Sequence, residues 1–154
     1  MLSEGDRVPD VRLTGTDGAP LSPADFRGHK LVLYFYPKDD TSGCTREAKD
    51  FTELAGDFEK AGAWILGVSK DDAKSHAKFT GKYDLKVKLA SDLDGSVCAA
   101  FGTWVEKSLY GRKYLGIERA TFLIDRDGTL ARIWRKVKVP GHADEVLAAA
   151  RDLP

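Results

Sequence analysis

The chain has 154 residues, a length that suits one domain with a hydrophobic core of its own. Hydrophobic residues make up 42% and charged residues 31%, the composition of an ordinary soluble globular protein. The 24 Lys and Arg balance the 24 Asp and Glu, so no net field attracts nucleic acid or an anionic membrane. We therefore expect a single domain over residues 1–154 that has neither nucleic acid nor a membrane as partner.

Three features of the sequence indicate the cellular compartment of the protein. No segment reaches the length of a membrane span, and the first residues hold no apolar region of the kind found in signal peptides. The two Cys do not form the framework of close pairs that is typical of extracellular proteins. We expect a cytoplasmic protein, with an organelle form whose targeting segment has been removed as the alternative.

Strand and helix signals alternate along the chain, which favours an α/β domain with a largely parallel central sheet. The chain begins with a short expected hairpin, a strand at residues 11–14 followed by a turn at Asp17 and Gly18. The uninterrupted apolar run at residues 30–36 predicts a buried central strand. A long helix is expected over residues 42–60, because apolar side chains recur there at helical spacing.

The middle of the chain continues the alternation. A strand is expected at residues 63–68 and a helix at residues 71–83, with its first turn opened by aspartates. His76 lies on the apolar face of that helix together with Phe79 and Tyr83. We interpret His76 as a packing residue rather than a metal ligand.

The last third of the chain predicts further short elements. The Asp127–Gly128 pair is the signal of a two-residue hairpin between two strands, and apolar spacing predicts a final helix. The expected elements are a strand at 87–90, a short helix at 96–101, strands at 120–124 and 130–134, and a helix at 142–152.

Cys44 stands where the buried strand at 30–36 gives way to the helix that follows it. Unpaired N–H groups and the positive end of the helix dipole stabilise a thiolate at such a junction. Thr41 can aim a hydroxyl at the same point, and Pro37 fixes the turn that leaves the strand. An inert core Cys is the alternative, but the polar neighbours of Cys44, such as Ser42 and Arg46, argue against it. We therefore predict a reactive thiol.

The pattern Pro37-x-x-x-Thr41-x-x-Cys44 resembles the active-site signature of peroxiredoxins, and the run at 34–48 resembles their Q-type, or bacterioferritin-comigratory, branch. The resemblance covers nearly the whole chain, with further matches in the same order at 5–10, 91–92, 101–104, 119–125 and 140–142. It implies an α/β thioredoxin-like fold, with a central mixed β-sheet flanked by helices and an N-terminal hairpin.

The resemblance also implies a thiol-dependent peroxidase that reduces hydrogen peroxide and alkyl hydroperoxides. Cys44 would attack the peroxide and become a sulfenic acid. Thr41 would bond the thiolate and the attacked oxygen, while the N–H groups of Gly43 and Cys44 would hold the peroxide beside Pro37. Arg119 would supply the positive charge. Without the family match, a solvated surface role is the simpler interpretation of Arg119.

Other chemistries lack the residues that they need. A dithiol reductase needs Cys-x-x-Cys, but Thr41 stands at its first position, and a cysteine phosphatase needs Arg where Asp50 stands. A Cys-His-Asn protease is excluded because the sequence contains no Asn or Gln. The three His lack the spacing of metal ligands, and the turn at 125–128 lacks the later Glu that a calcium-binding loop needs. The sequence also has no Gly-rich loop of the kind that binds phosphate. No metal, haem or flavin cofactor is implied.

The chain departs from the family pattern at the resolving Cys, the second Cys that forms a disulfide with the oxidised peroxidatic Cys. Many Q-type members carry that Cys at the position of Lys49, others on the helix at 71–83, and neither place holds a Cys here. Cys98 is the only remaining candidate, and we favour a packed, inert thiol at the edge of the apolar face of its helix.

We therefore expect a one-Cys peroxidase recycled by an external thiol, which could be thioredoxin, glutaredoxin or a small thiol. A monomer is expected, with a weak dimer as the alternative. The competing function is a peroxide-sensing redox partner protein with a signalling or chaperone-like role. In that protein, oxidation of Cys44 would transmit a signal, and Cys44 would not be part of a catalytic cycle.

Overall fold

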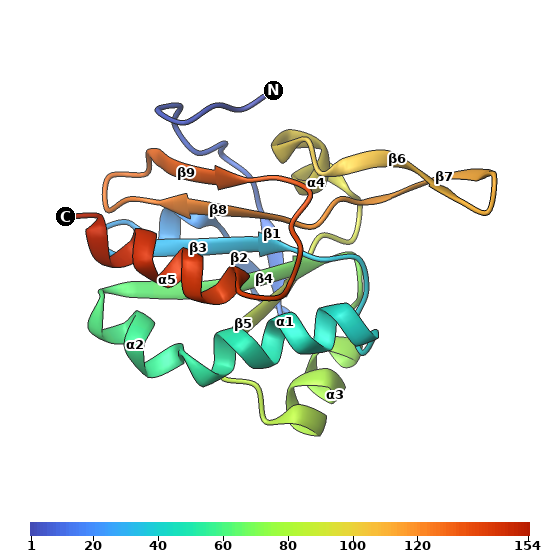
Figure 1. Ribbon diagram of the computed structural model, residues 1–154, viewed down its shortest axis with the longest axis horizontal. Helices are drawn as coiled ribbons and strands as arrows, with labels where there is room; N and C mark the ends of the chain where they lie inside the picture. The colour runs from blue at the N-terminus through green and yellow to red at the C-terminus, as the bar shows by residue number, and fades with distance from the viewer.

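A seven-stranded β-sheet runs through the middle of the molecule, and helices pack on both of its faces (Figure 1). The structure is a computed structural model that describes residues 1–154. The strand order in the sheet is β2-β1-β5-β4-β3-β8-β9. The strands are β1 (Leu13–Gly15), β2 (Pro20–Leu21), β3 (Lys30–Phe35), β4 (Ala63–Ser69), β5 (Lys88–Ser91), β8 (Ala120–Ile124) and β9 (Leu130–Trp134).

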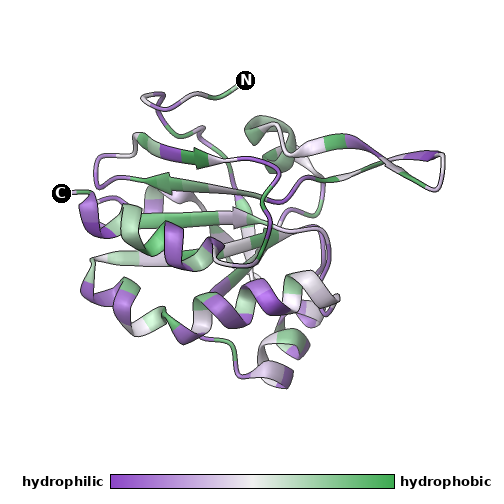
Figure 2. Cartoon of the chain, viewed as in Figure 1, coloured by the Kyte–Doolittle hydropathy of each residue, from purple (hydrophilic) through white to green (hydrophobic).

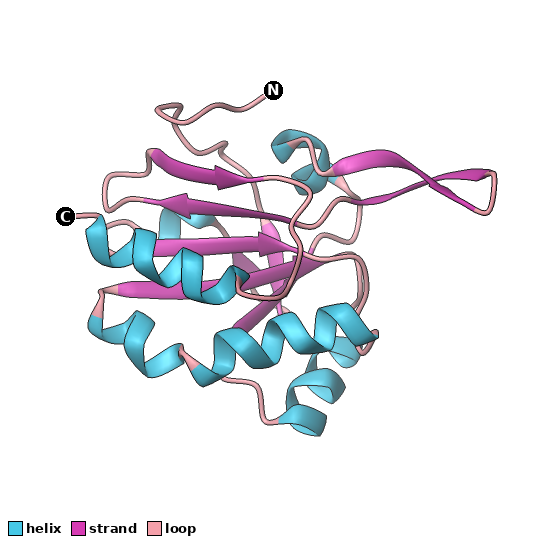
Figure 3. Ribbon diagram, viewed as in Figure 1, coloured by secondary structure: helices cyan, strands magenta, loops and turns pink.

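The helices, coloured cyan in Figure 3, include those expected from the sequence in the expected order. They are the 3₁₀ turn η1 (Pro23–Phe26), α1 (Ser42–Glu53), α2 (Ala55–Lys60), α3 (Ala73–Tyr83), α4 (Ser96–Phe101) and α5 (His142–Asp152). The helix expected over residues 42–60 is interrupted at Leu54, which leaves α1 and α2 as two segments. Helix α3 begins after Asp72, whose carboxylate accepts the N–H of Ser75 at 2.9 Å and so caps the first turn.

The sheet is mixed, so the expectation of a largely parallel sheet is wrong, whereas the mixed sheet implied by the family resemblance is confirmed. Only the β3–β4 and β4–β5 pairs are parallel, and each of these is joined by a helical crossover. The expected N-terminal hairpin pairs β1 with β2 and then joins β5 in the antiparallel sense. The Asp127–Gly128 turn joins β8 and β9, and β8 lies antiparallel to β3.

Two hydrophobic cores lie on opposite faces of the sheet, since alternate side chains of β3 belong to different clusters. Val32 and Tyr34 face α1, α2, α3 and α5, while Leu33 and Phe35 face η1 and α4. All six residues of β3 are buried, and the central strands are among the most apolar parts of the chain (Figure 2). Strand β3 therefore fixes the point at which α1 begins.

A long hairpin arm of β6 (Trp104–Leu109) and β7 (Arg112–Ile117) projects from the body and pairs only with itself (Figure 1). The sequence predicted no strand or helix between residues 102 and 119. The turn residues Tyr110 and Gly111 both have positive φ, 52° and 78°, as a two-residue hairpin turn requires. None of the helices has the length and hydrophobicity that a membrane-spanning helix requires.

Candidate active site

Cys44 lies in the first turn of α1, directly after the carboxyl end of β3, as the sequence predicted. Its thiol is free, and the residue is only 2% exposed, packed in the core that α1 shares with Tyr34 and Ala48. Thr41 and Ser42 beside it are exposed. The sulfur is therefore covered, but the backbone that leads to it is open to solvent.

The backbone N–H groups of Ser42, Gly43 and Cys44 make no hydrogen bond within the protein. The first helical bond of α1 runs from the N–H of Thr45 to the carbonyl of Thr41, at 2.8 Å. Free N–H groups and the helix dipole make this first turn favourable for an anion. The turn can therefore stabilise negative charge that develops beside Cys44.

Arg119, at the head of β8, brings a positive charge to the same place. Its Nη2 lies 3.5 Å from the sulfur of Cys44, and its Nη1 donates to Oε1 of Glu47 at 2.8 Å. Cys44 and Glu47 are three residues apart on α1, so they share one helical face and one guanidinium. Only 17% of the Arg119 side chain is exposed. The surface role considered from sequence is therefore wrong.

Burial and neighbouring charges shift the pKa values of Glu47 and Arg119 at this site. Burial raises the pKa of Glu47 to about 7, although the ion pair with Arg119 acts to lower it. Its other carboxylate oxygen, Oε2, is buried and has no hydrogen-bond partner in the protein. Burial acts to lower the pKa of Arg119, but the charges of Glu47 and Cys44 raise it above its ordinary value. The guanidinium therefore stays charged beside the sulfur.

Gly43 allows Arg119 its close approach. A Cβ at position 43 would lie 3.1 Å from Nη2 of Arg119, tighter than an ordinary van der Waals contact. Gly43 therefore leaves both a free N–H and room for the guanidinium at the start of α1.

Thr41 is the N-cap residue of α1, and its hydroxyl donates to the carbonyl of Lys38 at 2.8 Å. It makes no hydrogen bond to Cys44, so the expected contact with the thiolate is absent in this state of the protein. The oxygen of the hydroxyl can still accept a hydrogen bond from a bound ligand. Pro37 is exposed and lies just past the end of β3, where the chain turns toward α1.

Cys98 belongs to the other core, on the opposite face of the sheet from Cys44. It is fully buried and packs with Val97 and Phe101, so it lies within the apolar face of α4 and not at the edge expected from the sequence, while Ala100 is exposed. Burial, followed by a hydrogen bond with Asp92, raises the pKa of the Cys98 thiol to about 12. The carboxylate of Asp92 also accepts the N–H groups of Val97 and Cys98, at 3.1 and 2.7 Å. These contacts hold Cys98 as a neutral thiol within α4.

Sequence reasoning missed several residues around Cys44. Glu47 could have been found from its spacing, three residues after Cys44 on the same helix. Lys107 on the arm is partly buried, and burial and the charge of Arg119 lower its pKa. His76 is buried as expected, but it is more than a packing residue, because its Nδ1 contacts Asp39 at 2.8 Å.

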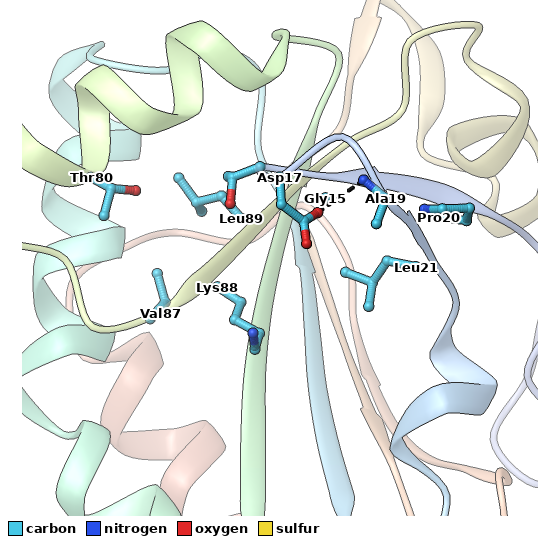
Figure 4. Close-up of a pocket in the computed structure, with 10 residues that line it drawn as sticks. Gly15, Asp17, Ala19, Pro20, Leu21, Thr80, Val87, Lys88 and Leu89 are labelled. Carbon is cyan, nitrogen blue, oxygen red and sulfur yellow. Dashed lines mark hydrogen bonds between the residues drawn. The ribbon is translucent and has the colours of Figure 1, made fainter.

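A pocket of about 310 Å³ opens between the N-terminal hairpin and the α3–β5 region (Figure 4). Gly15 and Asp17 line one side of it, and Thr80, Val87 and Leu89 line the other. Cys44 and Arg119 do not line this pocket, so it is separate from the thiol site. No group of three or more His, Cys, Asp or Glu side chains is arranged to hold a metal ion.

Comparisons with known proteins give consistent relationships. Residues 4–133 match the model of the AhpC/TSA family. The chain is 50% identical over 142 residues to peroxiredoxin Bcp of Xanthomonas campestris, which covers 92% of this chain and 89% of that protein.

Solved structures give the same relationship. A peroxiredoxin Q variant of Xylella fastidiosa superimposes with a TM-score of 0.93 at 39% identity, covering 99% of this chain and 97% of that one. The Xanthomonas campestris bacterioferritin comigratory protein, studied for alkyl peroxide reduction, superimposes with a TM-score of 0.88 at 45% identity, covering 96% and 98%. The thioredoxin-like fold expected from the sequence is confirmed by these similarities.

Proposed function

Because the chain belongs to the AhpC/TSA family, in its Bcp or peroxiredoxin Q branch, and is a thiol-dependent peroxidase, we propose that Cys44 is its peroxidatic residue. We propose hydrogen peroxide and alkyl hydroperoxides as substrates. The observation that carries the assignment is the contact of Cys44 with the Arg119 guanidinium, at the start of a helix whose first N–H groups are free.

The reaction begins with attack of the Cys44 thiolate on one peroxide oxygen. The S–O bond forms as the O–O bond breaks, the sulfur is oxidised to a sulfenic acid, and the leaving oxygen takes up a proton as water or alcohol. Arg119 and the free N–H groups of Gly43 and Cys44 stabilise the negative charge on the oxygens. The hydroxyl oxygen of Thr41 accepts a hydrogen bond from the bound peroxide, since its own O–H donates to the carbonyl of Lys38. Pro37 lies beside the bound peroxide, at the exposed turn between β3 and α1.

We propose a one-Cys cycle for the second half of the reaction. An external thiol attacks the sulfenic acid, releasing water and forming a mixed disulfide, and a second thiol restores the Cys44 thiolate. The burial of Cys98 on the other face of the sheet supports this cycle over an internal disulfide. Thioredoxin, glutaredoxin or a small thiol fits the role of reductant. We further propose one domain over residues 1–154, active as a cytoplasmic monomer, with a weak dimer as the alternative.

The competing proposal is a peroxide sensor in which oxidised Cys44 signals to a partner protein. A sensor would consume about one equivalent of peroxide and then stop, whereas a peroxidase consumes peroxide for as long as thiol is supplied. Multiple turnovers with hydrogen peroxide and dithiothreitol would support the peroxidase.

Substitution of Cys44 by Ser tests the assignment. We expect Cys44→Ser to abolish turnover with hydrogen peroxide and dithiothreitol, because Ser lacks an ionisable thiol, while circular dichroism stays unchanged. Cys98→Ser is the matched control, the same substitution at the other Cys, and should keep most of the turnover. Activity of Cys44→Ser within a few-fold of the wild type would refute Cys44 as the nucleophile. Loss of turnover in a folded Cys98→Ser protein would refute the one-Cys cycle.

A further inference from the structure

Exposed apolar side chains are concentrated on the arm of β6 and β7. Eight large apolar residues of the chain are exposed to solvent, and five of them lie on this short arm. These five are Trp104, Leu109, Tyr110, Tyr114 and Leu115. Single exposed apolar residues are ordinary on a protein surface, whereas a group of them marks a surface that another molecule covers. The arm is therefore the strongest candidate for an interaction surface outside the thiol site.

Most of these residues lie toward the free end of the arm, which projects away from the body (Figure 1). Tyr110 in the turn is 97% exposed, and Leu109 and Leu115 are each more than half exposed. We call residues 109–115 the arm tip. Strands β6 and β7 pair only with each other, so the sheet of the body does not shield this tip. Its apolar side chains are left in water by the fold of the single chain.

Both faces of the two-stranded ribbon are apolar near the tip. Residues that pair across antiparallel strands share a face, and successive residues of one strand alternate between faces. The pairs Leu109–Arg112 and Lys107–Tyr114 therefore place Leu109 and Tyr114 on one face, and the pair Glu106–Leu115 places Leu115 on the other. A folded protein partner would cover one face and leave the other in water. The interfacial region of a lipid bilayer surrounds an inserted ribbon and covers both faces.

The charge of the arm has the sign that an anionic bilayer attracts. Residues 104–117 contain three cations, Lys107, Arg112 and Lys113, and one carboxylate, Glu106. Glu106 faces Lys113 at 3.7 Å, so Arg112 has no acidic partner on the arm. Long basic side chains can reach lipid phosphates while apolar neighbours insert beside them. The chain as a whole has no net charge, so its total gave no sign of this local excess.

The turn of the arm holds an aromatic residue at a position that favours a small polar one. Tyr110 has φ of 52°, a left-handed conformation in which Asn is far more common than a bulky side chain. Asn before Gly111 would suit the hairpin better, so the folding of the turn does not explain Tyr110. Tyr is, however, enriched where proteins meet the membrane interface. From Lys107 to the turn is roughly 10 Å of strand, which is close to the depth that interfacial segments reach.

The base of the arm lies beside the thiol site. Strand β7 ends at Ile117, and Arg119 follows two residues later. Burial and then the charge of Arg119 lower the pKa of Lys107, whereas the charge of Cys44 raises it, so Lys107 lies within the field of the site. A surface that binds the arm tip is therefore held within one arm's length of Cys44, roughly 20 Å for six residues of strand.

We propose that the arm tip is a membrane contact: Leu109, Tyr110 and Leu115 insert at the interface of an anionic bilayer, and Arg112 and Lys113 bind its headgroups. The thiol site is thereby held at the bilayer surface. The expectation that a membrane is not a partner came from the net charge of the whole chain, which does not describe the arm. The membrane contact does not depend on the role of Cys44, because it uses none of the residues that contact the sulfur.

The test is sedimentation of the full-length protein with vesicles of phosphatidylcholine alone or of phosphatidylcholine mixed with anionic phosphatidylglycerol. We expect binding to the anionic vesicles only, weakened by added salt. Tyr110→Asn should lower the partition coefficient about tenfold, since it removes the most exposed apolar side chain and keeps a favourable Asn-Gly turn. Arg112→Gln should lower it about fivefold, the effect of losing one cation near the surface.

Leu109→Ser and Leu93→Ser form a matched pair, because the two side chains are 56% and 57% exposed and only Leu109 lies on the arm. Leu109→Ser should weaken binding about tenfold, and Leu93→Ser should stay within about twofold of the wild type. No binding to anionic vesicles, equal binding to neutral ones, or unchanged binding of Tyr110→Asn would each overturn the proposal. So would a dimer without vesicles that Tyr110→Asn dissociates, since a second copy would then cover the arm tip. Peroxide turnover is not measured, so these outcomes leave the proposed function unaffected.

Discussion

Arg119 is the residue on which the proposed chemistry depends most after Cys44 itself. One guanidinium contacts the carboxylate of Glu47 and the sulfur of Cys44, and it fills the space that a side chain at Gly43 would need. The pair with Glu47 is buried, so its geometry is fixed and its charge is little screened by solvent. In the proposed reaction, this position lets Arg119 act on the thiolate and on the peroxide at once.

Removal of this charge should slow the reaction at Cys44. We expect Arg119→Ala to lower the rate of Cys44 oxidation by hydrogen peroxide about a hundredfold, the usual effect of losing one stabilising donor. Stopped-flow measurement under single-turnover conditions gives the rate directly. Arg151→Ala is the control, because Arg151 also faces a carboxylate, Asp57, but at an exposed site on α5. Equal rates in the Arg119→Ala and Arg151→Ala proteins would show that Arg119 has no electrostatic role at the sulfur.

At the residue level, the sequence predicted the thiol and its cation but not the groups that hold them. Cys44 and Thr41 were predicted from their place at the junction of a strand and a helix, whereas the roles of Gly43 and Arg119 were implied by the family resemblance. The contact between His76 and Asp39 joins residues far apart in the chain, so helical periodicity could place His76 on a buried face but could not supply its partner. A buried histidine on a helix is a signal that a polar partner exists elsewhere.

Strands β3 and β4 are packed so closely that one position between them admits no side chain. Gly67 pairs with Tyr34 across the two strands, and a Cβ there would lie 2.7 Å from the ring and hydroxyl of Tyr34 and 2.9 Å from Leu89. Tyr34 in turn stacks on Phe51 of α1, with ring centroids 4.8 Å apart. Gly67 therefore sets the position of the ring that supports α1.

A methyl group at Gly67 should destabilise the fold by overpacking. We expect Gly67→Ala to lower the free energy of unfolding by about 1–3 kcal/mol. Gly56→Ala in α2 is the matched control, because nothing lies within 4 Å of its added Cβ, and it should raise stability by about 0.5–1 kcal/mol. Urea denaturation of both variants measures the difference. A Gly67→Ala protein as stable as Gly56→Ala would contradict the close packing described here.

At the level of elements, periodicity and turn residues predicted most of the sheet and helices correctly, and they failed in particular places. The break at Leu54 within the expected helix 42–60 leaves no clear mark in a sequence that stays amphipathic across it. The arm of β6 and β7 was missed because its strands face solvent over much of their length and carry few buried apolar residues. Strand direction depends on tertiary crossovers, so the mixed sheet could not be derived from periodicity alone.

The whole molecule consists of two cores that share one sheet, and its stability depends on buried groups that titrate. His142 in the first turn of α5 is 5% exposed, and its Nε2 lies 2.8 Å from the hydroxyl oxygen of Thr121. Burial, with a smaller contribution from Arg119, lowers the pKa of His142 to about 4. The folded protein therefore holds this ring neutral at pH values where the unfolded chain protonates it.

This difference makes stability depend on pH. Between pH 6.5 and about 4 the unfolded state binds a proton that the folded state does not, so stability falls as the pH is lowered through that window. We expect His142 to contribute about 2 kcal/mol to this loss once solvent screening is allowed for. Urea denaturation of the wild type and of His142→Asn at several pH values measures the free energy of unfolding of each protein. The pH dependence of the difference between them gives the contribution of His142. A constant difference between the two proteins from pH 7 to pH 4 would contradict the assignment.

The comparison with His142→Asn is needed because Glu47 titrates in the opposite sense. The pKa of Glu47 is raised from 4.5 to about 7, so between these pH values the folded state retains a proton that the unfolded state has lost. Its contribution therefore lowers stability as the pH rises. Both proteins contain Glu47, so its effect cancels in their difference.

The role of Cys44 as the peroxidatic residue is tested by locating the site of oxidation after one equivalent of hydrogen peroxide. Reduced protein is treated in the presence of dimedone, which traps sulfenic acids, and the peptides that contain Cys44 and Cys98 are identified by mass spectrometry. We expect the dimedone adduct on Cys44 alone, with Cys98 recovered as a free thiol. An adduct on Cys98, or a stoichiometric Cys44–Cys98 disulfide, would contradict this expectation.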